Sequence, residues 1–548
     1  LRDNLFGLEL DQRCTQLAAF NRAFAAWRMI GNVAVLPPLN LACSGLSIGV
    51  SKQEWMKLAD RAVRQADPAA RQDMFGSERT LLNSEVETRM RNGLERMYDT
   101  FAQAPVLGSL IDPRRAGGDI FAADYNALAP VINEALSDGR HEIAEMAVSA
   151  QGLAKTSEIL SKKYTLVSTN VPYLGRSRQS AEMSNYLKNK HSISSHDLAT
   201  AFVERVCGQL SDGGSACVVT PQNWLFLGPY KKFREYFLRY LSWRMLFRLG
   251  SGAFEAISGE VVNVCLLTLE NNRPRRDSEM SCLDANFAEY DEKTSVARSG
   301  EIILNSQYKQ YENPNFIIRL EDYADDFPFL SEYANSYAGI CTGDYPRFGR
   351  TFWELTGFDD GWRPQQTTRD AKGGGSGFSQ AILWENDAGE LRKYVEEKLG
   401  KTAVGSWIRG KNAWGKKGVA VTLMSDLPVD PYYGELFDDN VAVIVPKDEK
   451  YIGAIYAFAE SGALSAEVRK INQKLAVKTQ YLLKIPFDVQ YWKDVADSRF
   501  AEGLPVPASN DPTQWLFSGH PNGSDDPLQV ALARLLGYRW PRQAGSSF

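Results

Sequence analysis

Residues that build metal sites and disulfide frameworks are scarce in this sequence of 548 amino acids. It has seven cysteines, an odd number, and no two of them stand in C-x-x-C spacing. Its four histidines do not stand at metal-ligand spacing from one another or from a cysteine. We therefore expect neither a metal centre nor a disulfide framework, and a reducing, cytoplasmic location fits this pattern.

Long apolar runs and a strong charge of one sign are also missing. No stretch of about 18 apolar residues occurs, so we expect no membrane-spanning helix. The net charge is −5, from 62 basic and 67 acidic residues. Any contact with nucleic acid must therefore come from local basic patches. The opening residues, LRDNLFGLEL, include neither an initiating Met nor a signal-peptide layout, so we expect a piece of a longer, non-secreted protein.

Strand-like and helix-like segments alternate along residues 1–330. An apolar content of 44% and a charged content of 24% are typical of globular proteins. We expect strands at 5–10, within 32–45, at 164–169, 215–221 and 262–269, with helices at 14–29 and 197–206. This alternation predicts a doubly wound α/β sheet. A charge-rich stretch at about 45–125 is predicted to be a helical insertion in this domain.

The pattern of predicted helices and strands changes near residue 331. Short strand-like segments, turns and the glycine run at 372–377 predict a separate α+β domain over 331–490, followed by a C-terminal segment at 491–548.

The sharpest chemical signal is Asn170-Val171-Pro172-Tyr173, directly after a strand that we expect to be buried. Open α/β sheets bind ligands at the carboxyl ends of their strands. Taken alone, the four residues would most often be an ordinary turn. Two further features favour a site: Glu9 ends another strand, where a carboxylate can bind a ribose diol, and Phe254 lies in a loop before a later strand.

The order of these segments resembles the gamma class of N6-adenine DNA methyltransferases. More narrowly, it resembles the large single-chain enzymes of phage-defence systems of the BREX/PglX and DISARM type. The resemblance rests on GLELD (7–11), STNVPYLGR (168–176), DLATAFVERV (197–206), GGSACVVTPQNWLF (213–226), GAFEAISGEVVNV (252–264) and GICTGDYPRF (339–348).

The resemblance implies that a methyl group moves from S-adenosylmethionine to N6 of an adenine flipped out of double-stranded DNA. The side-chain oxygen of Asn170 and the backbone carbonyl of Val171 would accept hydrogen bonds from the amine. Tyr173 and Phe254 would pack on the two faces of the base. Val171 stands where the family usually has Pro, so it offers the carbonyl without the fixed φ of Pro. Proteins of the same defence system are implied as further partners.

The resemblance also implies a cofactor site that this sequence holds only in part. Glu9 would bind the cofactor ribose with support from Asp11. Asn40 would lie beside the cofactor adenine, although a turn residue is the alternative that we favour. The family's glycine-rich loop does not precede Glu9 in these residues, so we expect an incomplete cofactor pocket.

The resemblance implies that residues 1–330 are the methyltransferase catalytic domain and that residues 331–490 are a target-recognition (DNA specificity) domain. Basic residues near aromatic ones mark candidate DNA contacts in this second domain, although a solvated loop is an equally good interpretation. The candidates are Arg347, Arg350, Arg363, Lys372, Arg409, Lys411, Trp414, Lys416 and Lys417. A second tetrapeptide of the methyltransferase type, Asp430-Pro431-Tyr432-Tyr433, is predicted to be a loop because no buried strand leads into it.

Three functions are compatible with these patterns. The leading one is a site-specific adenine methyltransferase of bacterial phage defence. A restriction-modification fusion, with its nuclease outside these residues, is the second. A non-catalytic DNA-binding or assembly module is the third, in which the absent glycine loop and Val171 are losses of function.

Overall fold

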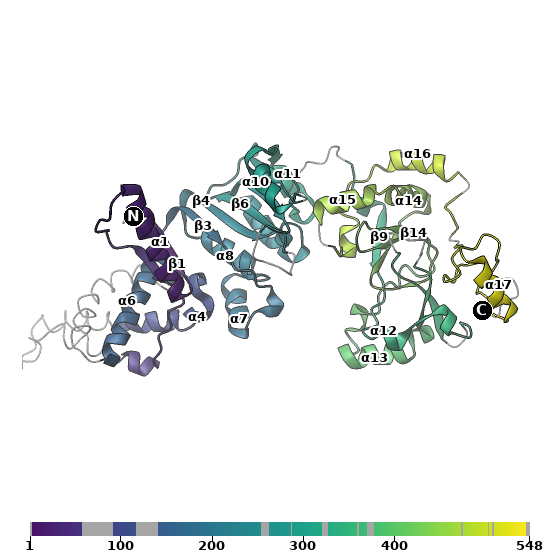
Figure 1. Ribbon diagram of the computed structural model, residues 1–548, viewed down its shortest axis with the longest axis horizontal. Helices are drawn as coiled ribbons and strands as arrows, with labels where there is room; N and C mark the ends of the chain where they lie inside the picture. Colours follow the sequence, from purple (N-terminus) through teal and green to yellow (C-terminus); the bar gives the residue numbers. More distant parts are fainter. Residues whose placement is uncertain are drawn as a thin grey trace, which may run out of the picture. The chain divides into compact units, whose positions relative to one another are not determined.

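A computed structural model describes most of the chain (Figure 1). The described residues are 3–56, 91–116, 141–253, 262–286, 288–320, 327–358, 361–369, 377–472, 475–501, 503–506 and 509–543. The chain divides into two compact units, Leu1–Phe316 and Ile317–Phe548. The domain boundary that we expect at 330/331 therefore falls inside the second unit.

The first unit contains two β-sheets. The smaller one pairs β1 (Phe6–Glu9) with β2 (Asn40–Cys43) in parallel. The larger one has the strand order β3-β4-β6-β5-β7-β8. Its strands are β3 (Tyr164–Asn170), β4 (Leu210–Pro221), β5 (Ser242–Gly250), β6 (Val264–Glu270), β7 (Glu279–Asp284) and β8 (Ile303–Ser306).

Strand direction in the larger sheet decides which loops meet at one edge. β3 and β4 are parallel, and β6 runs antiparallel to both β4 and β5. The carboxyl ends of β3, β4 and β5 therefore lie at the same edge, at Asn170, Pro221 and Gly250. The predicted α/β class is confirmed. The sheet is mixed, because β6 lies between β4 and β5 and runs antiparallel to both.

Helices of the first unit share an apolar core with the smaller sheet. It joins residues of the charge-rich stretch, such as Trp55 and Phe101, to Leu153 of α6 and Leu198 of α8. The stretch predicted as a helical insertion is thus packed against the α/β elements where it is described. The helices are α1 (Gln12–Ile30), α4 (Ala104–Leu107), α6 (His141–Ser161), α7 (Ala181–Lys190), α8 (Leu198–Cys207), α9 (Lys231–Tyr240), α10 (Tyr290–Ser299) and α11 (Gln307–Glu312).

The expectation that β3 is a buried strand is wrong. Its side chains are mostly exposed or half-buried, and Leu166 is 60% exposed. β3 is the terminal strand of the six-stranded sheet as described. Its side chains therefore lack the shielding that a second neighbouring strand provides. An apolar sequence alone does not show whether a strand is central or terminal.

The second unit is built on two four-stranded sheets, with the orders β10-β12-β11-β15 and β14-β13-β16-β9. The strands are β9 (Ala334–Ala338), β10 (Gly349–Thr351), β11 (Trp362–Gln366), β12 (Gln380–Leu383), β13 (Gly418–Thr422), β14 (Val429–Tyr432), β15 (Leu436–Phe437) and β16 (Val441–Pro446). The helices are α12 (Tyr345–Phe348), α13 (Glu390–Leu399), α14 (Ile452–Glu460), α15 (Ala463–Ile471), α16 (Val489–Arg499) and α17 (Pro527–Leu535).

Two features of the second unit differ from the expectations. The segment 491–548 is not set apart, because Trp515 packs edge-on against Phe378 with 5.2 Å between ring centroids. The predicted loop at Asp430–Tyr433 is also wrong, because β14 runs through Asp430, Pro431 and Tyr432. A proline is tolerated there because β14 is the terminal strand of its sheet. Among the described residues, no helix combines the length and apolar composition needed to cross a membrane.

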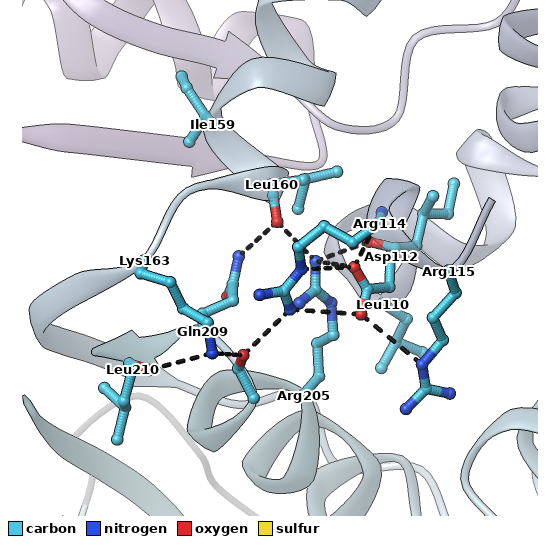
Figure 2. Close-up of polar contacts among 12 residues, drawn as sticks. Leu110, Asp112, Arg114, Arg115, Ile159, Leu160, Lys163, Arg205, Gln209 and Leu210 are labelled. Atoms are coloured by element: carbon cyan, nitrogen blue, oxygen red, sulfur yellow. Dashed lines mark hydrogen bonds and ion pairs between the residues drawn. The ribbon is translucent and has the colours of Figure 1, made fainter. Parts of the chain in front are cut away.

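A buried arginine of α8 contacts the end of α6 and lies beside Asp112 (Figure 2). Arg205 of α8 is 3% exposed and donates through Nη2 to the carbonyls of Ile111 and Leu160, each at 2.9 Å. The carboxylate of Asp112 lies 3.8 Å from the same nitrogen and accepts a 3.0 Å bond from Nε of Arg114. Burial alone would raise the pKa of Asp112, but Arg114 and Arg205 outweigh it and lower the pKa.

Asp112→Asn should lower the free energy of unfolding by about 3 kcal/mol at pH 7, because it leaves the buried Arg205 without its counter-charge. The pKa of Asp112 is lowered in the folded state, so its contribution is present above the unfolded pKa, near 3.8, and is lost as the pH falls through the folded value. Urea unfolding of wild type and variant from pH 7 to pH 3 measures both effects.

Asp99→Asn is the matched control, because Asp99 pairs with Lys52 at 2.9 Å on the surface and is 58% exposed. Its effect should stay below about 1 kcal/mol. An Asp112→Asn protein that is as stable as wild type at pH 7 contradicts the role of this pair.

Candidate functional site

The Asn170–Tyr173 segment begins where β3 stops pairing with β4. Asn170 is in register with Val219, and the backbone N–H of Val171 donates to the carbonyl of Val219 at 3.3 Å. Val171 is 3% exposed, whereas the side chain of Asn170 is exposed. The strand pairing therefore anchors Val171 and presents the Asn170 amide at the edge of the sheet.

A hydrogen bond joins the two polar side chains of the segment. The hydroxyl of Tyr173 donates to Oδ1 of Asn170 at 3.2 Å. Burial, with a smaller contribution from Cys265 on β6, raises the pKa of Tyr173 to about 12. Tyr173 is therefore neutral near pH 7, and its hydroxyl holds the Asn170 amide through the bond to Oδ1. A carbonyl oxygen has a second lone pair, which stays available to another donor.

The residues after Tyr173 are held against the start of α8. The carbonyl of Leu174 accepts the backbone N–H of Leu198 at 3.0 Å, and the N–H of Arg176 donates to the carbonyl of His196 at 3.1 Å. Asp197 caps α8 by accepting the N–H of Ala199 at 2.9 Å. The loop is thus fixed at both ends, at β3 and at α8.

The neighbouring loops at this edge are also fixed by side-chain bonds. Gln222, directly after β4, is buried and donates to the carbonyl of Val264 at 2.8 Å. Arg234 of α9 is fully buried and donates to the carbonyls of Trp224 at 2.6 Å and Leu227 at 2.8 Å. Sequence patterns gave no role to Gln222 or Arg234. Their partners are backbone carbonyls, which residue types in a sequence do not reveal.

The second stacking candidate, Phe254, lies outside the described residues. The strands that flank its segment end at Gly250 and begin at Val264, which are paired with each other at the edge that carries Asn170. The prediction for Phe254 is therefore untested.

The structure separates the three cofactor candidates. Glu9 is the last residue of β1 and its side chain is exposed. Among the described residues, no side chain or backbone N–H donates a hydrogen bond to its carboxylate. Asp11 is the N-cap of α1 and accepts the N–H of Arg13 at 2.7 Å. Asn40 is in register with Phe6, at the opposite end of the β1–β2 pair from Glu9, and its Oδ1 accepts Nζ of Lys155 at 3.0 Å. Asn40 is thus not brought to Glu9.

Most of the predicted DNA contacts are engaged within the second unit. Arg350 donates to the carbonyl of Pro346 at 2.6 Å, and Arg363 donates to that of Phe358 at 3.0 Å. Arg409 donates to the carbonyl of Gly339 at 3.0 Å. Trp414 packs edge-on against Trp384 in the core, with 5.0 Å between ring centroids. These four side chains are thus already engaged in contacts within the folded unit.

The remaining basic candidates differ in their pairing. Arg347 lies 3.4 Å from Glu390, and Lys411 forms an ion pair with Asp387. Lys416 and Lys417 are exposed, and neither has a carboxylate partner among the described residues. Lys372 lies outside the described residues. The structure thus leaves Lys416 and Lys417 as the cations most available to a ligand.

Comparison with known families and proteins gives a consistent result. Residues 3–254 match the family described as Eco57I restriction-modification methylase. The adenine-specific methyltransferase BrxX of Escherichia coli O9:H4 (strain HS) is 28% identical over 277 residues, 50% of this chain and 22% of BrxX. The adenine-specific methyltransferase PglX of Lacticaseibacillus casei (strain Zhang) is 22% identical over 392 residues, 63% of this chain and 31% of PglX. The matches thus span less than a third of either relative.

Among solved structures, the Type IIL restriction-modification enzyme MmeI in complex with DNA aligns with 72% of this chain and 59% of its own. The sequence identity is 10% and the TM-score is 0.39, which is too low to support an argument about either unit.

Proposed function

We propose that this chain, whose residues 3–254 belong to the Eco57I restriction-modification methylase family, methylates N6 of an adenine flipped out of double-stranded DNA in bacterial phage defence. One structural observation is the main support for this proposal. The exposed Asn170 amide stands at the carboxyl end of β3, with its oxygen oriented by Tyr173 and its strand anchored through Val171.

The chemistry requires hydrogen-bond acceptors at the amine. The lone pair of an exocyclic amine is delocalised into the base, so the amine is a weak nucleophile. Oδ1 of Asn170 and the carbonyl of Val171 accept its two N–H bonds, which draws the nitrogen toward sp³ geometry and localises the lone pair. Acceptors held in place before the reaction need no reorganisation during it.

Tyr173 has two tasks in this mechanism. Its ring supplies one face on which the unstacked adenine packs. Its hydroxyl holds the Asn170 amide at the edge of the sheet through the bond to Oδ1. Phe254 is proposed to cover the other face of the base.

S-adenosylmethionine, when bound, supplies an electrophilic methyl group on a sulfonium sulfur. Glu9 fits this cofactor, because its carboxylate is exposed at a strand end and can accept both hydroxyls of a ribose. Asp11 contributes through the geometry of the turn, since its carboxylate already caps α1.

The second unit is proposed to bind the DNA. Lys416 and Lys417 are placed to contact phosphates because they are exposed and have no described acidic partner. The restriction-modification fusion differs from this proposal only by a nuclease outside these residues.

Asn170→Ala in the intact protein should abolish methylation and leave DNA affinity within a few-fold of wild type. The substitution removes one acceptor at the amine and no group that faces phosphate. Single-molecule sequencing of host DNA should show N6-methyladenine at one short motif in wild type and none in the variant, and a fluorescence-anisotropy titration measures DNA affinity.

Asn335→Ala, at an exposed position on β9 in the second unit, is the control and should methylate normally. Methylation by Asn170→Ala would exclude the acceptor role. Absence of methyladenine with all three proteins would favour a non-catalytic DNA-binding module.

Tyr173→Phe keeps the ring and loses the hydroxyl, so single-turnover methylation should slow by only about 2- to 12-fold, as expected for one net hydrogen bond. Tyr173→Ala also removes the stacking face and should slow the same step by a further 5- to 150-fold, as expected for about 1–3 kcal/mol per stacked base. Equal rates for the two variants would exclude stacking.

Replacing Lys416 and Lys417 together by Gln should reduce the slope of log affinity against log salt by about 2, because each phosphate contact contributes about 0.9. Lys450→Gln is the control, since Lys450 already pairs with Asp448 at 2.7 Å. An unchanged slope in the double variant shows that this pair does not contact phosphate.

A further inference from the structure

A polar pocket in the second unit has no role in the proposed mechanism. It encloses about 490 Å³ between the end of β11, the start of β12 and the loops that follow β9 and β15. Its rim is exposed at Gly343, Asp439 and Asn440. Thr342, Tyr345, Gln365, Gln380, Asp438 and Asp439 supply most of its polar lining.

Gln365 is the unusual member of this lining. Its side chain is fully buried on β11, a strand paired on both sides, yet neither Nε2 nor Oε1 has a hydrogen-bond partner. Gln380, paired with it across β12, has both ends of its amide engaged, with the Tyr345 hydroxyl at 2.7 Å and Ser379 at 3.3 Å. Buried amides are nearly always satisfied in folded proteins, so an unpartnered amide on a residue that lines a pocket points to a ligand.

The charges around the pocket restrict that group. Asp438 and Asp439 are adjacent acids at its wall and rim, and burial raises the pKa of Asp438 to about 6. Asp439 lies 3.7 Å from Nη2 of Arg409, which neutralises only part of this charge. Acidic side chains repel phosphate and accept N–H groups, so the pocket disfavours the DNA backbone and favours an amino-bearing base edge.

We propose that this pocket binds an adenine of the recognition sequence, with Gln365 as the residue that specifies it. Adenine presents a donor, the N6 amine, beside an acceptor, N7, and a glutamine amide matches both at once. The inference rests on the proposed function only in taking DNA as the ligand of the second unit. We propose that the adenine bound here is a different base from the adenine that is methylated.

The test is selection of randomised duplexes by the full-length protein, followed by sequencing of the bound DNA. Gln365→Met, of similar volume and without hydrogen-bonding atoms, should lose discrimination at one adenine of the bound motif by about 5- to 150-fold, the range of a bidentate contact to a base. Gln366→Met is the matched control. Gln366 is the next residue of β11, is equally buried, and does not line the pocket, so its motif should be that of wild type.

Base analogues separate recognition from packing. Purine in place of the affected adenine lacks the 6-amino group but keeps N7, so it should weaken wild-type binding by no more than Gln365→Met does. The purine substitution should cost the Gln365→Met protein little further affinity, because that variant has already lost the contact to the amine. Loss at a cytosine instead of an adenine would overturn the assignment to adenine, and an unchanged motif in a folded Gln365→Met protein would overturn the proposal as a whole.

Asp439→Asn, at the exposed rim, covers the case in which Gln365→Met does not fold. It should relax the same motif position, and an unaltered motif would again overturn the proposal. If wild-type protein selects a motif but does not methylate it, the proposed reaction is contradicted. The motifs of wild type and Gln365→Met can still be compared in that case. Wild-type protein that selects no motif contradicts both.

Discussion

The parallel pairing of β3 with β4 is the constraint on which the candidate site depends. It sets Asn170 opposite Val219 and stops there, so that the next residues turn away from the sheet with their first N–H still bonded to β4. A shift of one residue in this register would turn the Asn170 side chain to the other face of the sheet. The bonds between Leu174 and Leu198 and between Arg176 and His196 then hold the far end of the loop on α8. A short loop tied at both ends presents an amide with little loss of entropy on binding.

Sequence patterns were sufficient for the elements that contact each other locally. The strands β1, β3, β4 and β6 and the helices α1 and α8 lie where apolar periodicity and turn residues place them, because those signals act within one segment. The position of β3 at the end of its sheet was not predictable, since it depends on which other strands pair with it. The strand β14 was missed because no buried strand leads into Asp430 in the sequence, and its strand structure depends on pairing with β13, which the segment itself does not show.

The same distinction applies to the site residues. Asn170 could be proposed from the sequence because a polar side chain after an apolar strand is a local signal. The contacts of the basic residues in the second unit could not be predicted, because groups such as Asp387 for Lys411 and the Gly339 carbonyl for Arg409 are distant in sequence. Gln365 stands out only because its buried amide has no hydrogen-bond partner in the folded unit. A sequence does not show which polar groups lack a partner after folding.

Val171 shows how a departure from a family pattern can be compensated. Proline at this position would fix φ and carry no N–H, so it would leave the Val219 carbonyl without this bond. Valine gives up the fixed φ but donates to Val219 at 3.3 Å and buries its side chain to 3% exposure. Both residues immobilise the peptide whose carbonyl is proposed to accept the amine, one by covalent restriction and the other by pairing and packing. The acceptor is a backbone atom in either case, so the proposed reaction depends on the position of this peptide and not on the identity of the side chain it carries.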